Sequence, residues 1–431
     1  MSETPTRSRR QAAFRFVYAC ALMNAVSFGI MIPVLPNLIK HLVGGDTATA
    51  STWNVLFAVT WGVMQLFSAP ILGMLSDRIG RRPVLLISLF GLAVDFLFMA
   101  LAPNLAWLFV GRVINGMTAA SFSTANAYVA DVTEPKDRAK AFGWMGSAFS
   151  FGFLLGPVFG GFLAGEFMHG YLTAHGYDGD LALRLPFLVA AGLTAINWLY
   201  GLFVLPESLP PEKRVTKFNW SRANPLGSLA FLREHGELLG LASVGFLYQL
   251  AHTVLPSIFV LYAGFRYNWG SDMVGLTMML TGILGIVVQT FFVGRVVARI
   301  GERGALLLGT FGGAVGFILY GLAPNGWAYI ASAPVFALMS FLQPGLQGLM
   351  TRRVGPQEQG QLQGANQSLQ GIASVTGPMI FGLTFAWAVR HDAVLHAPGL
   401  PIFIAAGLLM GAFLLSIRVG HAPRQVAAPA E

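Results

Sequence analysis

GMLSDRIGRRP, residues 73–83, is a short charged turn between two long apolar stretches. The turn concentrates one acid and three arginines between glycines, at positions Gly73, Asp77, Arg78, Gly80, Arg81 and Arg82. The spacing Gly-x₄-Arg-x-Gly-x-Arg recurs at residues 294–303, displaced by 221 residues. The chain therefore carries the same charged turn twice.

Two further patterns share this displacement of 221 residues. Leu-Ala-Pro-Asn occurs at 101–104 and 322–325, and Gly-Pro occurs at 156–157 and 377–378. Unrelated local patterns with one common displacement indicate an internal duplication. We expect an N-terminal bundle at 1–205, a polar, basic, proline-rich linker at 206–236 and a C-terminal bundle at 237–431.

The composition indicates a membrane protein. The 431 residues are 55% hydrophobic and 11% charged, whereas soluble chains contain about 25% charged residues. Apolar stretches long enough to cross a bilayer, roughly 20 residues each, occur near 15–39, 53–73, 83–102, 105–129, 140–164, 185–205, 238–262, 272–294, 304–323, 326–350, 361–388 and 398–419. The expected fold class is an all-α membrane protein with twelve transmembrane helices in two pseudo-symmetric six-helix bundles.

The N-terminal residues and the single cysteine bear on processing and on disulfide or metal sites. MSETPTRSRRQ is polar and basic, and the apolar stretch after it is long enough to span, so we expect no cleaved signal peptide. Cys20 is the one cysteine, so neither a disulfide framework nor a thiolate metal cluster is expected.

The positive charges lie on one side of the predicted membrane. With twelve spans, that side holds 22 of the 27 Lys and Arg residues, and the other side holds Lys40, Arg184, Arg266 and Arg390. This asymmetry is the positive-inside bias, so both termini are expected in the cytoplasm. The net charge of +8 thus indicates topology and contact with anionic lipid, and no nucleic-acid partner is expected.

Two parallel halves of six spans resemble the layout of major facilitator transporters, whose substrate site lies between the halves. The turn at 73–83 is similar to the signature loop of that superfamily between helices 2 and 3. The resemblance implies a conformational latch formed by Gly73, Asp77, Arg78, Gly80, Arg81, Arg82 and Asp131. The alternative is topological anchoring by positive charge alone, although an anchor needs neither Asp77 nor the glycines.

Two intramembrane motifs agree with this resemblance. Leu108-x₃-Arg112-x₃-Gly116 is similar to the family's arginine motif in helix 4, and a charge at this depth needs a partner, a cavity or water. A purely structural arginine is the alternative. In helix 5, Gly152, Gly156, Pro157 and Gly160 resemble a motif associated with exporters, although close helix packing also explains these glycines.

The resemblance narrows to the tetracycline-resistance branch of drug/proton antiporters. It rests on segments 30–38, 68–96, 111–120, 141–165, 265–275 and 343–354. Asp95 matches that branch's aspartate in helix 3, and Gln65 and Asp131 match other positions. Three positions depart from the branch: Asn24 and Gly313 stand where it has aspartates, and Gly285 stands where it has a histidine.

Asp95 is the expected proton carrier, with Arg112 tuning it and His252 as a further titratable candidate. A carboxylate inside a span loses hydration, so it can exchange a proton as access changes from one side to the other. The alternatives are that Asp95 fastens two helices and that His252 is a structural hydrogen-bonding residue.

Polar residues in the predicted spans form the candidate substrate cavity, because intramembrane amides need partners and often face ligands. They are Asn24, Gln65, Tyr248, Gln249, Gln289, Gln343, Gln347, Asn366 and Gln367. Nearby aromatic residues suit an amphipathic substrate.

The sequence thus predicts a monomeric secondary transporter of the bacterial inner membrane. It is expected to export small amphipathic drug-like molecules by proton antiport; its partners are the small-molecule substrate, protons and the lipid bilayer, and no cofactor or metal is expected. Proton-coupled uptake of a small metabolite is the alternative. An enzyme is disfavoured because the one suggestive pattern, His41-x₄-Asp46, stands alone in an outer loop and the chain has no Walker or zinc-ligand motif.

Overall fold

The computed structural model describes residues 7–119, 121–134, 137–214, 232, 236–355 and 358–419. Across this part of the chain the structure is helical and contains no strand. The helices before the central linker are α1 (Arg7–Met31), α2 (Leu35–Leu42), α3 (Thr47–Ile79), α4 (Arg81–Leu101), α5 (Leu105–Thr118), α6 (Ser121–Val132), α7 (Arg138–Ala164), α8 (Glu166–Ala174), η2 (Gly179–Leu183), α9 (Leu185–Val204) and η3 (Pro211–Lys213).

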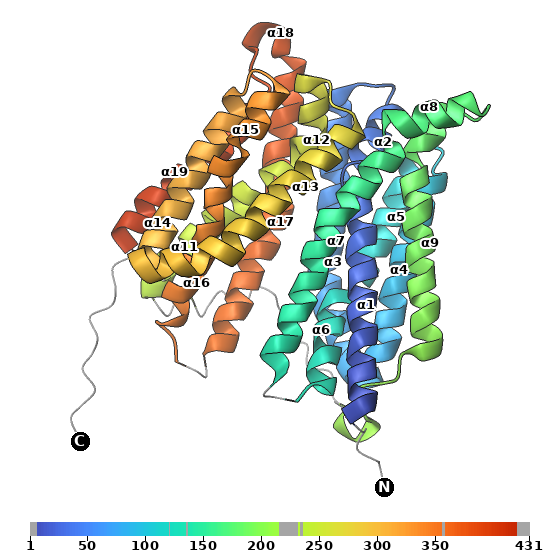
Figure 1. Cartoon of the computed structure of the whole chain (residues 1–431), viewed down its shortest axis with the longest axis vertical. Helices are drawn as coiled ribbons and strands as arrows, with labels where there is room; N and C mark the ends of the chain where they lie inside the picture. Colours follow the sequence, from blue (N-terminus) through green and yellow to red (C-terminus); the bar gives the residue numbers. More distant parts are fainter. Residues whose placement is uncertain are drawn as a thin grey trace. The chain divides into compact units, whose positions relative to one another are not determined.

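After the linker the helices run from α11 to α19 (Figure 1). They are α11 (Gly236–His252), α12 (Val254–Tyr267), α13 (Ser271–Val287), the π-helical turn η5 (Val288–Phe292), α14 (Val293–Leu322), α15 (Gly326–Ala337), η6 (Leu338–Phe341), α16 (Leu342–Thr351), α17 (Gln359–Arg390), α18 (Asp392–Leu395) and α19 (Leu400–Val419).

Eleven helical segments among the described residues are long and apolar enough to cross a membrane. One of them, Ser271–Leu322, has 52 residues and would be about 78 Å long at about 1.5 Å per residue, against a hydrocarbon core of about 30 Å. Its backbone is non-helical at Gly301, which divides it into two spans. Twelve spans result, as the sequence predicts.

The duplicated patterns adopt matching local structures. Gly80 and Gly301 both have positive φ, 111° and 73°, and each separates two spans. Asn104 and Asn325 both cap the helix that follows, with the side-chain oxygen accepting backbone N–H groups. Equivalent residues therefore perform the same structural role in both copies.

The chain packs into two compact units. The first contains Met1–Pro225 together with Val260–Gly282, and the second contains Leu226–Phe259 and Ile283–Glu431. These units describe packing, whereas the predicted boundaries at 205 and 237 describe the sequence repeat; the division into six-helix halves therefore stays a prediction.

In the first unit, α1 packs along α7 and α4 packs against α9 and α5. Its buried core includes Tyr128, Met145 and Ala148. In the second unit, α14 packs against α19 and α16, and α11 packs against α19 and α17. There Tyr320 and Tyr329 stack with ring centroids 4.0 Å apart.

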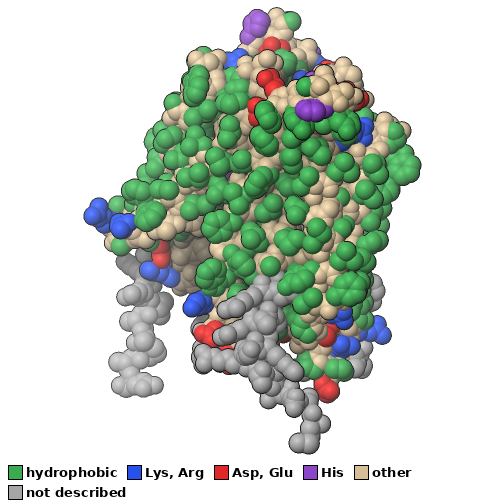
Figure 2. Space-filling model, turned by 45° about the vertical axis from the view of Figure 1, so that its right-hand side comes forward, with side chains coloured by type: hydrophobic (Ala, Val, Ile, Leu, Met, Phe, Trp, Pro, Cys, Tyr) green, Lys and Arg blue, Asp and Glu red, His purple; other side chains and the backbone are tan. Residues whose placement is uncertain are grey.

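The outer surface is apolar. Hydrophobic side chains cover most of the visible face in Figure 2, and large ones are widely exposed, such as Phe203 at 80% and Phe67 at 61%. In water a surface of this kind would be an aggregation liability, whereas lipid chains solvate it.

Candidate functional site

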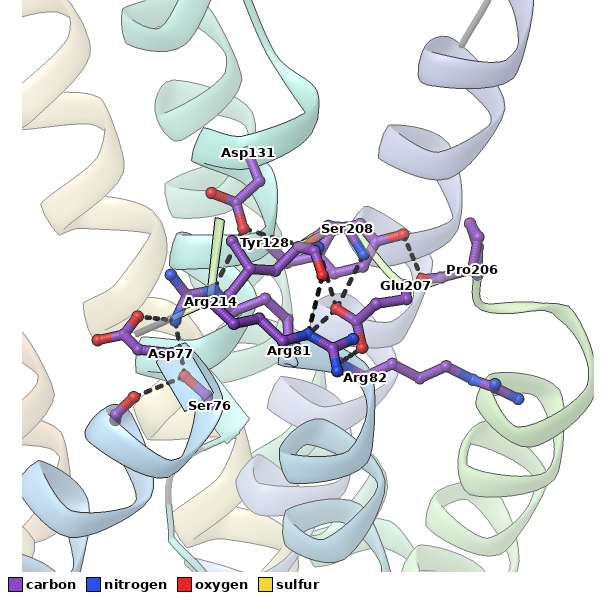
Figure 3. Close-up of polar contacts among 12 residues, drawn as sticks. Ser76, Asp77, Arg81, Arg82, Tyr128, Asp131, Pro206, Glu207, Ser208 and Arg214 are labelled. Carbon is purple, nitrogen blue, oxygen red and sulfur yellow. Dashed lines mark hydrogen bonds and ion pairs between the residues drawn. The ribbon is translucent and has the colours of Figure 1, made fainter. Parts of the chain in front are cut away.

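Arg81 is the centre of the charged turn between α3 and α4 (Figure 3). Its Nη1 lies 2.5 Å from Asp77 Oδ1 and donates to Ser76 Oγ at 2.7 Å, while its Nε donates to Asp131 Oδ2 at 3.1 Å. One guanidinium therefore joins the end of α3 to the end of α6. The paired Asp77 side chain is 45% exposed and Arg81 is 12% exposed, so Asp77 can return to water while Asp131 still pairs with Arg81.

Glu207 fixes the other side of this turn. Its carboxylate accepts the backbone N–H groups of Arg81 at 2.8 Å and Arg82 at 3.2 Å, which are the first residues of α4. It also accepts the N–H groups of Ser208 and Leu209 at 3.0 Å each. An anion at a helix N-terminus satisfies free donors and the helix dipole.

Gly80 makes this approach possible. A Cβ built at Gly80 would lie 2.6 Å from Glu207 Cδ, and the φ of 111° is strained for any residue with a side chain. Glu207 is not among the residues predicted from the sequence. Its position beside Pro206, directly after the sixth predicted span and on the side of the charged turn, was the available signal.

Arg82 contacts a different helix from those that Arg81 contacts. Its Nη2 donates to the carbonyl of Leu202 at 2.6 Å, near the C-terminus of α9. In the other copy of the repeat, Arg303 donates to the carbonyl of Ile417 at 2.9 Å, near the C-terminus of α19. Both arginines satisfy carbonyls that a helix end leaves free.

Two members of the predicted latch are outside this network. Arg78 is exposed and makes no ion pair with any described residue. A Cβ added at Gly73 would meet open space. The structure thus brings Asp77, Arg81 and Asp131 together, and all of their contacts lie within the first unit.

Asp95 and Arg112 form a buried ion pair between α4 and α5. Arg112 Nε donates to Asp95 Oδ1 at 3.3 Å, and Arg112 Nη2 pairs with Asp95 Oδ2. The side chains are 0% and 6% exposed, respectively. Gly111 allows this contact, because a Cβ there would lie 2.7 Å from Asp95 Oδ1.

The sequence predicts that Arg112 acts on Asp95 electrostatically, and the structure places the two side chains in direct contact. The partner required by an arginine inside a span is the aspartate of the neighbouring helix, 17 residues earlier. The same contact fits a helix fastener and a proton site, because protonation of Asp95 would remove the charge that Arg112 faces.

The glycines of α7 lie against α1. A Cβ on Gly156 would approach Gly29 Cα to 2.5 Å, and one on Gly152 would approach the carbonyl carbon of Ala25 to 2.6 Å. Gly160 meets Ile30 in the same way, at 3.0 Å from its Cα. Small residues at four-residue spacing therefore let the two backbones touch.

The cavity candidates are spread over several helices. Tyr248 and His252 lie close on α11 with ring centroids 5.7 Å apart, His252 is exposed, and Gln249 is half-buried. Among the amides, Gln289, Gln343 and Gln367 are exposed, and Asn24, Gln65, Gln347 and Asn366 are half-buried. Gln289 lies in the π-helical turn η5, and such turns are frequent at functional sites.

The two glycine departures have different surroundings. A Cβ added at Gly285 would meet nothing within 4 Å. At Gly313 it would lie 2.8 Å from Leu409 Cδ1 and 3.0 Å from Met339 Cγ. A Cβ at position 285 therefore meets open space, whereas one at position 313 would require the side chains of Leu409 and Met339 to shift.

No group of three or more His, Cys, Asp or Glu side chains in the described part of the chain could hold a metal ion. These sites consist of an ion-pair network at the turn between α3 and α4, and of a buried ion pair, amides and close helix contacts within the apolar helical segments. A helical protein with a duplicated charged turn and a buried intramembrane ion pair belongs to the class of polytopic secondary transporters.

The chain belongs to the Major Facilitator Superfamily, whose family profile matches residues 17–378. It is 37% identical to the tetracycline resistance protein, class C, of Escherichia coli over 84% of this chain and 87% of that protein. Identity to the class E protein of Escherichia coli is 34%, over 84% and 85% of the two chains, and to its class B protein 30%, over 92% and 94%.

Solved structures share the fold. The human organic anion transporter MFSD10 (TETRAN) superposes with a TM-score of 0.65 at 23% identity, covering 96% of this chain and all of that one. The nucleoside transporter NupG superposes with a TM-score of 0.72 at 14% identity, covering 95% and 100%. As a member of the Major Facilitator Superfamily, the protein is a multi-pass membrane transporter of small molecules and not an enzyme.

Proposed function

We propose that this protein exports small amphipathic, drug-like molecules in exchange for protons. It acts as a monomer in the bacterial inner membrane with both termini in the cytoplasm. The observation that carries the proposal is the similarity to tetracycline resistance proteins over 84% of this chain and 87% of the class C protein. The similarity therefore extends over most of the chain and is not confined to one motif.

The buried ion pair supports proton coupling. Asp95 and Arg112 compensate each other's charge where an isolated charge would cost at least a few kcal/mol. A proton on Asp95 weakens the attraction between α4 and α5, so proton uptake changes the preferred packing of the first unit. In this proposal His252, exposed beside Tyr248, is a second protonatable group.

The turn around Arg81 supports a conformational latch. Arg81 is only 12% exposed whereas Asp77 is 45% exposed, so the ion pair stabilises one conformation and Asp77 is the partner that can return to water. Asp131 and Ser76 hold Arg81 in place while Asp77 is released. The latch then acts through Asp77 and Arg81.

The test is transport into inside-out vesicles whose lumen is more acidic than the medium. Export by antiport predicts accumulation of the compound inside, and collapse of the pH gradient abolishes it. Compounds for this test come from a growth-inhibition panel. They are the amphipathic compounds that inhibit cells expressing the gene less than cells without it. Accumulation in right-side-out vesicles driven by inward proton flow would overturn export and establish uptake by symport.

Tetracycline itself is expected to be exported weakly or not at all. Gly285 and Gly313 lack the polar and acidic side chains of the resistance branch, and Asn24 cannot titrate. The measurement is the minimal inhibitory concentration of tetracycline in a sensitive host, with Gly285→His as a second variant because a Cβ at this position meets nothing within 4 Å. Strong resistance from the unaltered protein would show that these side chains are dispensable.

A further inference from the structure

The first residues of α13 pack with the first unit, although they belong to the second copy of the sequence repeat. The stretch Val260–Gly282, which includes the start of α13 at Ser271, groups with Met1–Pro225 by its contacts. The displacement of 221 residues instead assigns this stretch to the half that is predicted to begin at 237. Specific contacts must therefore hold it against the first unit.

One of these contacts is a hydrogen bond between Asn37 and Ser271. Asn37 lies half-buried on the short helix α2, and its Nδ2 donates to Ser271 Oγ at 2.9 Å. Ser271 is the first residue of α13 and is only 4% exposed. The same amide also donates to the carbonyl of Pro33, at the longer distance of 3.4 Å. The bond to Ser271 thus joins two segments that are 234 residues apart in the sequence.

The backbones of α7 and α13 touch beside this bond. A Cβ added at Gly161 would lie 3.1 Å from the carbonyl carbon of Ser271, and one added at Gly275 would lie 3.1 Å from the carbonyl carbon of Pro157. Such close helix contact adds dispersion attraction, which has no preferred direction. The hydrogen bond from Asn37 is directional, so it fixes the position of the start of α13.

This contact lies at the end of the first unit opposite the charged turn. Helix α3 begins at Thr47, shortly after α2, and ends at Ile79, next to Arg81. Its 33 residues separate the two ends by about 50 Å, at about 1.5 Å per residue. Accordingly, α2 and α6 lie at opposite ends of this unit in Figure 1. The first unit therefore has a polar contact at each end.

We propose that Asn37 and Ser271 form a second conformational latch, which holds the start of α13 on α2 and α7 and opens when the transported molecule leaves at this end. The inference rests on the proposed function for its direction, because cytoplasmic termini place this end outside. A neutral hydrogen bond suits a contact that breaks in every cycle, since water can replace either partner at a modest net cost. Unlike the pair of Asp77 and Arg81, this latch contains no charge and should be insensitive to salt.

The first test measures opening without transport. The full-length protein with Cys20→Ala and Val274→Cys carries one thiol, three residues after Ser271, at a position that is 0% exposed. Its labelling rate by a charged methanethiosulfonate in detergent is followed by intact mass and measures how often the start of α13 opens. Asn37→Leu should raise this rate about five-fold, the effect of one net hydrogen bond. An unchanged rate would overturn the latch.

Two further variants separate the latch from a general loosening of the fold. Thr52→Ala removes a hydroxyl from α3 near the same end, and this hydroxyl donates within its own helix, to the carbonyl of Ala48 at 3.1 Å. The labelling rate should not change. In a Ser271→Ala background, Asn37→Leu should cause no further increase, because its partner is already absent. An equal increase in Thr52→Ala, or a second five-fold increase in the Ser271→Ala background, would refute the pairing.

The second test asks whether transport requires the latch to open. Asn37→Cys/Ser271→Cys in the Cys20→Ala background is bridged in inside-out vesicles by a short, uncharged bifunctional methanethiosulfonate, and intact mass confirms the bridge. The bridge should abolish export, and its removal by a reductant should restore export. The single variants Asn37→Cys and Ser271→Cys, treated in the same way, should keep their export rates. Export at an unchanged rate by the bridged protein would contradict the latch.

The latch and the exporter fail independently. Labelling that depends on Asn37 in a protein that exports nothing would support the latch and overturn the exporter. Export that continues through a bridged latch would support the exporter and overturn the latch.

Discussion

Asp95 and Arg112 each carry a charge whose burial alone would cost free energy, and their pairing compensates that cost. Each is a charged group within a span, and each side chain is almost completely buried. Removing one partner from a buried pair leaves an uncompensated charge, which costs about 3–5 kcal/mol, whereas removing both can be nearly neutral. The pair can therefore be dissected by single and double substitutions.

Asp95→Asn should abolish uphill, pH-gradient-driven export while still permitting downhill flux, because the amide keeps hydrogen bonds but carries no proton. Arg112→Ala should lower the yield of folded protein in the membrane by leaving Asp95 unpaired. The double variant Asp95→Asn/Arg112→Gln should recover yield but not coupling. Vesicle flux and membrane yield measure the two effects separately, and undiminished proton-driven export by Asp95→Asn would move the coupling site to His252.

Asp77→Asn should impair transport severely while membrane yield stays close to normal. The substitution removes the ion pair with Arg81 at 2.5 Å, but Asp131 and Ser76 still hold that guanidinium. Arg78→Gln is the matched control, since exposed Arg78 contacts no described acid. Initial export rates in vesicles provide the measurement. A rate for Asp77→Asn equal to the unaltered protein would reduce the turn to a topological anchor.

At the scale of the elements, α1 and α7 are held by backbone contact. Glycines at four-residue spacing on α7 face Ala25, Gly29 and Ile30 on α1. No hydrophobic effect drives helices together within lipid, so this close approach supplies dispersion contacts that larger residues would prevent. Close packing against α1 is therefore enough to explain the glycine motif of α7, with or without a role in export.

Gly156→Ala should destabilise the first unit by about 1–3 kcal/mol, the usual cost of overpacking. Its Cβ would lie 2.5 Å from the Cα of Gly29, and backbone cannot rotate away. Gly146→Ala on the same helix is the control, because a Cβ there meets nothing within 4 Å. Thermal unfolding in detergent distinguishes the two variants. Equal midpoints would mean that the contact between α1 and α7 tolerates a methyl group.

The whole molecule is organised by its charges and by its duplication. Twelve spans with basic residues on one side predict that reporter fusions after residue 220 and at the C-terminus are cytoplasmic. Fusions near residues 175 and 395 should be external. Alkaline phosphatase and green fluorescent protein fusions make this measurement, because each is active on one side. A cytoplasmic result near residue 175 would contradict the twelve-span arrangement.

Much of this architecture could be read from the sequence. The apolar stretches predicted near 83–102, 185–205 and 398–419 appear as helical segments at 81–101, 185–204 and 400–419. The break between two spans at Gly301 could also be inferred, since Gly301 repeats Gly80. These features are local: span length, charge asymmetry and turn glycines act within a few residues of the chain.

The tertiary structure decided which residues meet. The sequence indicated that Arg112 needs a partner and that Asp95 is unusual, but only the packing of α4 against α5 pairs them. It likewise joins Glu207 to the start of α4, 125 residues earlier, and surrounds Gly313 closely while leaving Gly285 open. Hydrophobicity determines where a chain enters the membrane, whereas partner choice depends on how helices rotate and approach, and that is settled by contacts between segments distant in sequence.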